Sequence, residues 1–267
     1  ADTQTWSAAP GTASGGVLID GDIDDAWPYV DYSPEFDADG RLHISWIWRL
    51  GLGFVNNTNY HYVYWDGSTV RRIDGSVQEV PITRANCPVI KAIPTGSGLA
   101  NQCALTVNPV TKRPHIAYNR FPDVGPQYQQ TPHLFWDGTQ WVDQQVNSDY
   151  GGTPSIENYA LANGRPTIAI DDNGHIHIMT RIIDHPTYPQ KVVVYSSSDM
   201  GQTWTCRKVT DLDATYLEPT YDRQIWKEDR LLQIPIMPWP EFGGPYAVSI
   251  VTYDPLLYDE EPIGGSE

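Results

Sequence analysis

The sequence is poor in cysteine, histidine and basic residues, with three Cys, seven His and 17 Lys and Arg among 267 residues. Asp and Glu number 33, which gives a formal net charge of −16. This excludes a general nucleic-acid-binding surface, because binding to phosphates needs clustered Lys and Arg. The sequence has no apolar run long enough to span a membrane and no signal-peptide pattern. An acidic, lysine-poor composition rich in Asn, Gly and Pro predicts a secreted protein.

Long helical patterns are also missing. Pro and Gly, 22 of each, interrupt the sequence every few residues. The segments between them are short, often alternating, and rich in Val, Ile, Tyr, Trp and Thr, which predicts a nearly all-β fold with a turn at 228–230. The expected strands are 42–49, 60–65, 104–108, 115–119, 133–136, 167–171, 175–181, 191–196, 231–237 and 247–253.

A loose internal repeat organises these strands. Residues 36–46 read Phe-Asp-Ala-Asp-Gly-Arg-Leu-His-Ile-Ser-Trp and are echoed by 170–180 and, more faintly, by 107–118. Residues 197–204 read Ser-Ser-Asp-Met-Gly-Gln-Thr-Trp, which is the Asp-box pattern. In it, Asp and Ser or Thr side chains bond the turn backbone, Gly takes a positive φ and Trp packs beneath. Such a turn is structural and typical of a β-propeller blade.

The repeats define four units, at 32–82, 100–147, 163–210 and 216–254. We therefore predict an all-β fold, a β-propeller of antiparallel four-stranded blades with about four blades in this chain. Residues 1–267 are expected to form a single propeller domain or the C-terminal part of a larger, seven-bladed one, with 1–31 as the end of another blade. A partner chain is a candidate source of further blades.

The segment from Tyr32 to Arg49 is the first candidate for chemistry, because it reads as strand, Asp-Gly turn and strand with these two residues at its ends. A phenol can donate or accept a proton and a guanidinium can hold a carboxylate, so the pair suits an anionic sugar. The alternative is a structural role for each residue. Tyr32 would cap a hairpin, and Arg49 would lie solvated at the end of a strand.

Four groups of residues resemble the bacterial-neuraminidase-repeat type of propeller polysaccharide lyases, which includes ulvan lyases and rhamnose–glucuronate lyases. The most specific is His-x-x-Trp-x-Trp-Arg at 43–49, with a Tyr seventeen residues before the Arg. The resembling segments are 39–49, 57–61 with 80–83, 99–102 followed by 113–117, and 218–226.

The resemblance implies β-elimination at a uronate of an acidic polysaccharide, with no cofactor for catalysis. Arg49 would neutralise the uronate carboxylate, and Tyr32 would serve as acid or base. The catalytic histidines of the family come from blades before this tyrosine, which this chain lacks. The residues expected to bind substrate are Trp48, Asn59, His61, Asn101 and Gln102.

The cysteines leave three alternatives open. Cys87 and Cys103 can form a disulfide, remain free thiols, or join His61 and His115 in a structural Cys₂His₂ zinc site. Four protein ligands would leave no open position on the metal, so such a zinc would not be catalytic. Acidic residues at 21–25 or 171–173 raise Ca²⁺ as an alternative, although neither segment has EF-hand spacing.

Two other functions compete with a lyase. One is a carbohydrate-binding propeller without catalytic activity, which would keep the aromatic and Arg cleft but lack the base. The other is a sialidase-like hydrolase, suggested by the Asp-box, with an arginine triad and a Tyr/Glu pair. Its candidate arginines are Arg49, Arg120, Arg181 and Arg223, and a carboxylate pair suited to a glycosidase is Glu218 with Asp222.

Overall fold

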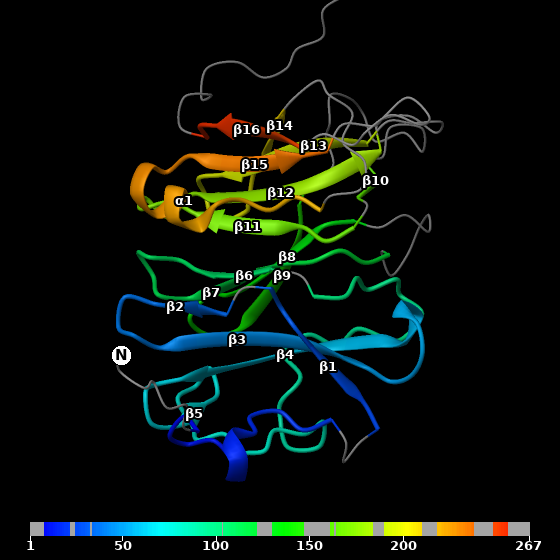
Figure 1. The fold of residues 1–267 in the computed structure, drawn as a ribbon, viewed down its shortest axis with the longest axis vertical. Coiled ribbons are helices and arrows are strands. Elements are labelled where there is room, and N and C mark those ends of the chain that lie inside the picture. Colours follow the sequence, from blue (N-terminus) through cyan, green and yellow to red (C-terminus); the bar gives the residue numbers. More distant parts are fainter. Residues whose placement is uncertain are drawn as a thin grey trace, which may run out of the picture.

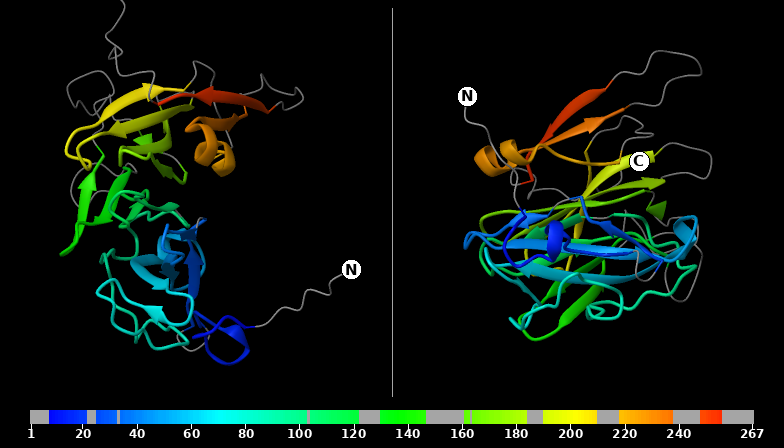
Figure 2. Two further views of the ribbon diagram at one scale, coloured as in Figure 1. Left: turned by 90° about the vertical axis from the view of Figure 1, so that its left-hand side faces the viewer. Right: turned by 60° about the horizontal axis from the view of Figure 1, so that its bottom comes forward.

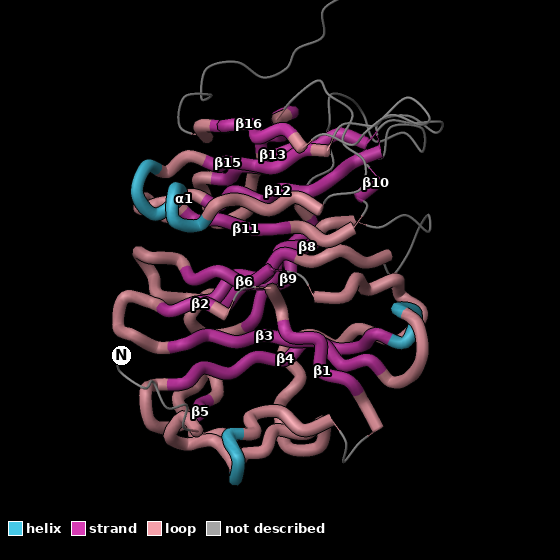
Figure 3. Tube along the Cα trace, viewed as in Figure 1, coloured by secondary structure: helices cyan, strands magenta, loops and turns pink. Residues whose placement is uncertain are grey.

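The chain is built almost entirely of antiparallel strands in four sheets (Figures 1 and 3). The all-β prediction is therefore confirmed. The computed structural model describes residues 8–21, 25–32, 34–102, 104–121, 130–146, 161–162, 164–183, 190–209, 218–237 and 248–255. No helix among these is long and apolar enough to cross a membrane.

Three of the sheets have four strand positions each. In the first and the third, two short strands share one position: β1 and β2 both pair with β3, and β10 and β11 both pair with β12. The first sheet contains β1 (Trp27–Val30), β2 (Glu35–Phe36), β3 (Leu42–Arg49), β4 (Asn57–Trp65) and β5 (Val70–Arg71). The second contains β6 (Ala104–Val107), β7 (Pro114–Ala117), β8 (Pro132–Trp136) and β9 (Trp141–Gln145). The third contains β10 (Leu161–Ala162), β11 (Thr167–Ile170), β12 (Ile176–Ile183), β13 (Gln190–Ser197) and β14 (Thr205–Lys208).

The described part of the fourth sheet pairs β15 (Leu232–Ile236) with β16 (Ser249–Tyr253). The sheets follow one another along an arc that is open on one side (Figure 2, left). Successive four-stranded sheets in this arrangement are the blades of a partial propeller. Residues Trp27–Val30, expected in an earlier blade, belong to the first sheet.

Hydrophobic residues fill the space between neighbouring sheets. Ile47 and Tyr60 of the first sheet pack with Leu105 and Ile116 of the second. Strand β3 is buried along most of its length. Because successive side chains of a strand point to opposite faces, Ile47 faces the second sheet while Trp46 packs on the other side. A strand buried on both faces needs apolar residues at consecutive positions, which explains the sequence Trp-Ile-Trp.

The repeated motifs form equivalent turns between strands. Asp37 Oδ1 accepts from the backbone N–H groups of Asp39 and Arg41, both at 2.9 Å. Asp171 Oδ1 accepts from His175 N at 2.8 Å in the same way. Residues 171–174 therefore form a hairpin turn. The repeat histidines are equivalent too, since His43 and His177 each use Nδ1 to bond the next strand.

The Asp-box turn has the predicted structure. Asp199 accepts from the backbone N–H of Thr203 at 2.9 Å and from its hydroxyl at 2.6 Å. Gly201 has a φ of 83°, and the indole of Trp204 donates to the Gly201 carbonyl at 3.0 Å. The turn therefore closes the β13–β14 hairpin by side-chain bonds to its own backbone.

We expect Asp199→Asn to lower the melting temperature at neutral pH and to have little effect near pH 2. Hydrogen bonds from Thr203 lower the pKa of Asp199 from 3.8 to about 2. A carboxyl group whose pKa is lower in the folded state stabilises above its unfolded pKa, and this stability is lost as the pH falls through the folded value. Thermal unfolding of both proteins from pH 7 to pH 2 tests this, and a difference that stays constant with pH would contradict it.

Residues 223–230 correct the sequence prediction of a turn. Arg223–Asp229 form a helix, α1. The Asp222 carboxylate accepts from Gln224 N and Ile225 N at 2.8 and 3.1 Å, and Arg230 ends the helix with a φ of 58°. An N-capping Asp before seven residues without Gly or Pro was a signal for this helix.

Candidate functional site

Four polar side chains from different parts of the chain meet in one cluster; three of them stand two or three residues before β2, β6 and β11, and the fourth, Glu218, precedes helix α1. The Tyr32 hydroxyl donates to Glu218 Oε2 at 3.1 Å. Arg165 donates through Nε to the same carboxylate oxygen and through Nη1 to Gln102 Oε1 at 3.0 Å. Its guanidinium also lies 4.5 Å from the centroid of the Tyr32 ring. We call Tyr32, Gln102, Arg165 and Glu218 the axial cluster.

The axial cluster is accessible to solvent. Tyr32 is 53% exposed, and the side chains of Arg165 and Glu218 are 28% and 25% exposed. A ligand can therefore reach the phenol, the guanidinium and the carboxylate together.

A second guanidinium lies close behind the cluster. Arg181, on β12, is buried, and its burial lowers its pKa while the Glu218 carboxylate raises it. A Cβ at Gly164 would lie 2.5 Å from Arg181 Nη2 and 3.3 Å from Glu218 Oε1. Gly164 has a φ of 90°, a backbone conformation that favours glycine. Its lack of a side chain also leaves room for these groups. Two cations thus surround one carboxylate, which favours binding of a further anion.

Arg49 has other partners than Tyr32, which corrects the expected pairing. Arg49 lies opposite Trp27 in the β1–β3 register. Trp27 is five residues before Tyr32, which corresponds to roughly 16 Å along an extended strand. The Nε of Arg49 donates to Asn57 Oδ1 at 2.9 Å and its Nη1 to the Tyr29 hydroxyl at 2.7 Å. The guanidinium nearest to Tyr32 in the described contacts is therefore that of Arg165.

Asn101 and Gln102 connect these two arginines. The Asn101 side chain accepts from Arg49 Nη2 and from Asn57 Nδ2, and Gln102 accepts from Arg165. Gln102 has a φ of 31°, an uncommon backbone conformation for a residue with a Cβ. Of the two predicted binding residues, Gln102 therefore belongs to the axial cluster and Asn101 is its neighbour in the chain.

The structure places the other predicted binding residues inside the first sheet. Trp48 and His61 are 1% and 2% exposed, and the His61 ring stacks on Trp46 at 5.5 Å between centroids. Asn59 Oδ1 accepts from the backbone of Ile93 at 2.9 Å, which gives it a structural bond. Because both faces of the first sheet are covered here, Trp48 and His61 lie in the core.

Of the predicted zinc ligands, His61 lies beside the backbone of Cys87, but His115 packs elsewhere, in the second sheet. His61 Nδ1 lies 3.0 Å from the Pro88 carbonyl oxygen, whereas His115 stacks on Phe135 in the second sheet, with its Nδ1 2.9 Å from His133 Nε2. Cys87 is a free, buried thiol, and burial raises its pKa to about 12. Cys103 lies outside the described residues. Among those described, no group of three or more His, Cys, Asp or Glu is placed to hold a metal ion.

We expect the buried histidines to make the fold sensitive to mild acid. Burial lowers the pKa of His61 from 6.5 to about 4 and that of His133 to about 3. Such groups are neutral when folded, so stability is full above pH 6.5 and falls as the pH drops towards these values. In that range each histidine should lower the free energy of unfolding by about 1.4 kcal/mol for each pH unit of acidification. Urea unfolding from pH 7 to pH 5 measures this loss, and an unchanged pH dependence in His61→Gln would contradict the assignment.

Sequence reasoning missed Arg165 and weighed Glu218 only for a hydrolase. Arg165 stands two residues before β11, just as Gln102 stands two residues before β6. Aligning the repeat units by their inner strands would therefore have placed both residues at equivalent positions.

A model of the BNR repeat-containing family matches residues 3–149, more than half of the chain. Among solved structures, a polysaccharide lyase aligns with 85% of this chain and 45% of its own at 11% identity and a TM-score of 0.51. A Hadza microbial sialidase aligns with 86% of this chain and 44% of its own at 14% identity and a TM-score of 0.50. An ulvan lyase bound to a glucuronate–rhamnose sulfate ligand shares 18% identity, over 72% of this chain and 42% of its own, with a TM-score of 0.46. No curated protein matches the chain. The likeness to the first two structures shows a propeller fold, and the chain spans less than half the length of all three proteins.

Proposed function

This chain belongs to the BNR repeat-containing family, and from that premise we propose that it acts on an acidic polysaccharide outside the cell. The reaction we propose is β-elimination at a uronate residue, with the axial cluster as the reacting site. The rest of a larger propeller, in the same chain or a partner chain, would supply further groups.

The observation that carries this proposal is the contact of a solvent-exposed phenol with a guanidinium and a carboxylate. β-Elimination removes the C5 proton of the uronate and expels the C4 oxygen, so it needs a base, an acid and a cation for the sugar carboxylate. Tyr32 can take the C5 proton while its own proton passes to Glu218, to which its hydroxyl is hydrogen bonded, and a proton returned through Tyr32 can then protonate the departing C4 oxygen. Arg165 lies over the Tyr32 ring and can turn its guanidinium to the uronate, with Arg181 behind it.

Arg49 takes a different role from the one that the sequence suggests. Three of its nitrogens donate to Tyr29, Asn57 and Asn101. This orients Asn101 beside Gln102, so we assign Arg49 to positioning and to binding of a neighbouring sugar.

Hydrolysis is a second candidate, favoured by the hydrogen bond between Tyr32 and Glu218. A carboxylate that accepts the phenol proton makes the phenol oxygen a nucleophile. In that case Tyr32 would attack the anomeric carbon as its proton passes to Glu218, the glycosidic oxygen would leave and take up a proton, and water would then release the sugar from Tyr32, so the product would contain no double bond.

The two reactions are distinguished by their products. We expect incubation with ulvan or another rhamnose–glucuronate polymer to produce ultraviolet absorbance from a 4,5-unsaturated uronate. Two loss-of-function variants accompany the wild type. Arg165→Met, which removes the cation, and Arg49→Ala, which removes the positioning residue, should both lower this absorbance. New reducing ends without this absorbance would select hydrolysis, and binding without new ends would select a non-catalytic binding propeller.

A further inference from the structure

A cavity is lined by residues that closely follow the members of the axial cluster in the sequence. Glu35 stands three residues after Tyr32, Thr106 four after Gln102, Ile170 five after Arg165 and Tyr221 three after Glu218. We call Glu35, Thr106, Ile170 and Tyr221 the second set. All four residues of the second set line one cavity of about 160 Å³, which helix α1 closes on one side.

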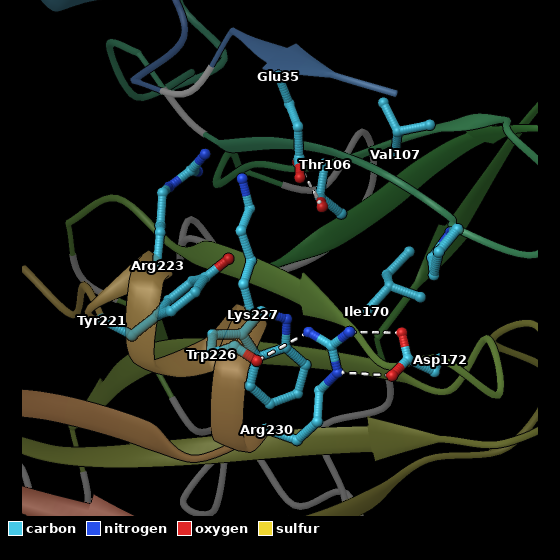
Figure 4. A pocket seen from close by; sticks show the side chains of 11 residues that line it. Glu35, Thr106, Val107, Ile170, Asp172, Tyr221, Arg223, Trp226, Lys227 and Arg230 are labelled. Atoms are coloured by element: carbon cyan, nitrogen blue, oxygen red, sulfur yellow. Dashed lines mark hydrogen bonds and ion pairs between the residues drawn. The ribbon is translucent and has the colours of Figure 1, made fainter. Parts of the chain in front are cut away.

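The lining of this cavity is positive in an otherwise acidic protein. Arg223, Lys227 and Arg230 line it together with only two carboxylates, Glu35 and Asp172. Arg230 is committed to Asp172, with its Nε 2.9 Å from Oδ2. The excess positive charge therefore belongs to Arg223 and Lys227, which point from α1 towards the strands that carry Glu35 and Thr106 (Figure 4).

These two cations have few partners in the protein. Arg223 lies 5.9 Å from the centroid of the Tyr221 ring. The Lys227 side chain has no ion pair or hydrogen bond with any residue that the structure describes. The acidic neighbour on the helix, Asp222, is already used as the N-cap, with its carboxylate accepting from the backbone. Two cations with free donors at a cavity wall are available to an anionic group.

The opposite wall offers acceptors and apolar surface. The Glu35 carboxylate accepts from the Thr106 hydroxyl at 2.7 Å through one oxygen, which leaves the other oxygen for a ligand hydroxyl. Tyr221 and Trp226 form the apolar side, and the Tyr221 hydroxyl is held by the Ile168 carbonyl at 3.1 Å. A ligand that satisfies all three walls carries an anionic substituent, hydroxyl groups and an apolar ring face.

We propose that this cavity is a second binding site, for one anionic sugar residue. Arg223 and Lys227 bind its carboxylate or sulfate group, and Glu35 accepts a hydrogen bond from one of its hydroxyls. The small volume admits a single ring and not a chain threaded through the site. The site needs no turnover at the axial cluster, so it goes beyond the proposed function and can be tested separately from it.

Nuclear magnetic resonance of the whole chain tests the site. The indole N–H signal of Trp226, assigned with Trp226→Phe, should shift on addition of D-glucuronate or glucose 6-sulfate but not of glucose. We expect the double variant Arg223→Gln/Lys227→Met to weaken this binding by about tenfold or more. Lys208→Met on β14 is the matched loss of one lysine away from the cavity and should bind as the wild type does.

Several outcomes would overturn the proposal. These are an equal shift with glucose, equal affinity for inorganic sulfate alone, unchanged affinity in the double variant, or no shift with either acidic sugar. Lys227→Arg, which keeps the charge, should retain binding, and the double variant should melt at the wild-type temperature, so that its loss of binding is not unfolding. Tyr32→Phe should leave this binding unchanged even where it abolishes turnover, so failure at one site is distinguishable from failure at the other.

Discussion

Replacement of Tyr32 by Phe is expected to lower kcat on the acidic polysaccharide by about 10²–10⁴-fold, the usual contribution of a positioned acid or base. The change removes only the hydroxyl that donates to Glu218. The ring remains under Arg165, whose guanidinium carbon lies 4.5 Å from the centroid of the Tyr32 ring in the wild type. Substrate binding should therefore be retained, so KM should change little while kcat falls. Steady-state kinetics, followed by product formation, measures both constants.

The matched control for this substitution is Tyr64→Phe. Tyr64 lies on β4 and its ring stacks on His43 at 6.0 Å, away from the axial cluster, so its loss of a hydroxyl should leave kcat unchanged. Because Tyr32 is exposed, the Phe variant should also unfold at the wild-type midpoint. A variant that keeps activity within about threefold of the wild type would remove Tyr32 from the proton transfer.

The fold could be predicted well from the sequence because local signals and packing agree. The range 42–49 is the observed strand β3, since its apolar residues and the Asp-Gly turn before it specify the same structure. The Asp-box likewise depends on bonds within eight residues. Helix α1 was missed because its single buried residue, Trp226, gives no periodic pattern, and only the Asp222 cap marks it.

The site was predicted only in part because it is assembled from different sheets. Tyr32 and Gln102 could be singled out, but their partners Arg165 and Glu218 lie 63 and 116 residues beyond Gln102 in the sequence. Register also decides more than sequence spacing does. Arg49 pairs with Trp27, which stands five residues before Tyr32. The sequence spacing of Tyr32 and Arg49 therefore did not make them neighbours.

Replacement of Trp46 by Ala is expected to destabilise the fold by about 3–5 kcal/mol, the range for deleting a large buried aromatic side chain. Trp46 is 0% exposed and is held on two sides. Its ring stacks on His61 at 5.5 Å with 18° between planes and meets the edge of Trp48 at 6.5 Å. Its indole nitrogen has no hydrogen-bond partner among the residues that the structure describes, so the loss comes from packing and from the cavity, not from a broken hydrogen bond.

Urea unfolding of Trp46→Ala beside Trp27→Ala separates burial from residue type. Trp27 lies in β1 of the same sheet but is 45% exposed, so its removal should cost about 1 kcal/mol or less. The same cavity should also reach His61, because the ring that shields one of its faces is gone. Water entering there would reduce the desolvation that lowers the pKa of His61 to about 4, and the pKa should rise towards 6.5 in the variant. Equal losses in the two Trp variants, or an unchanged His61 pKa, would show that the sheet collapses around the missing ring and leaves no cavity.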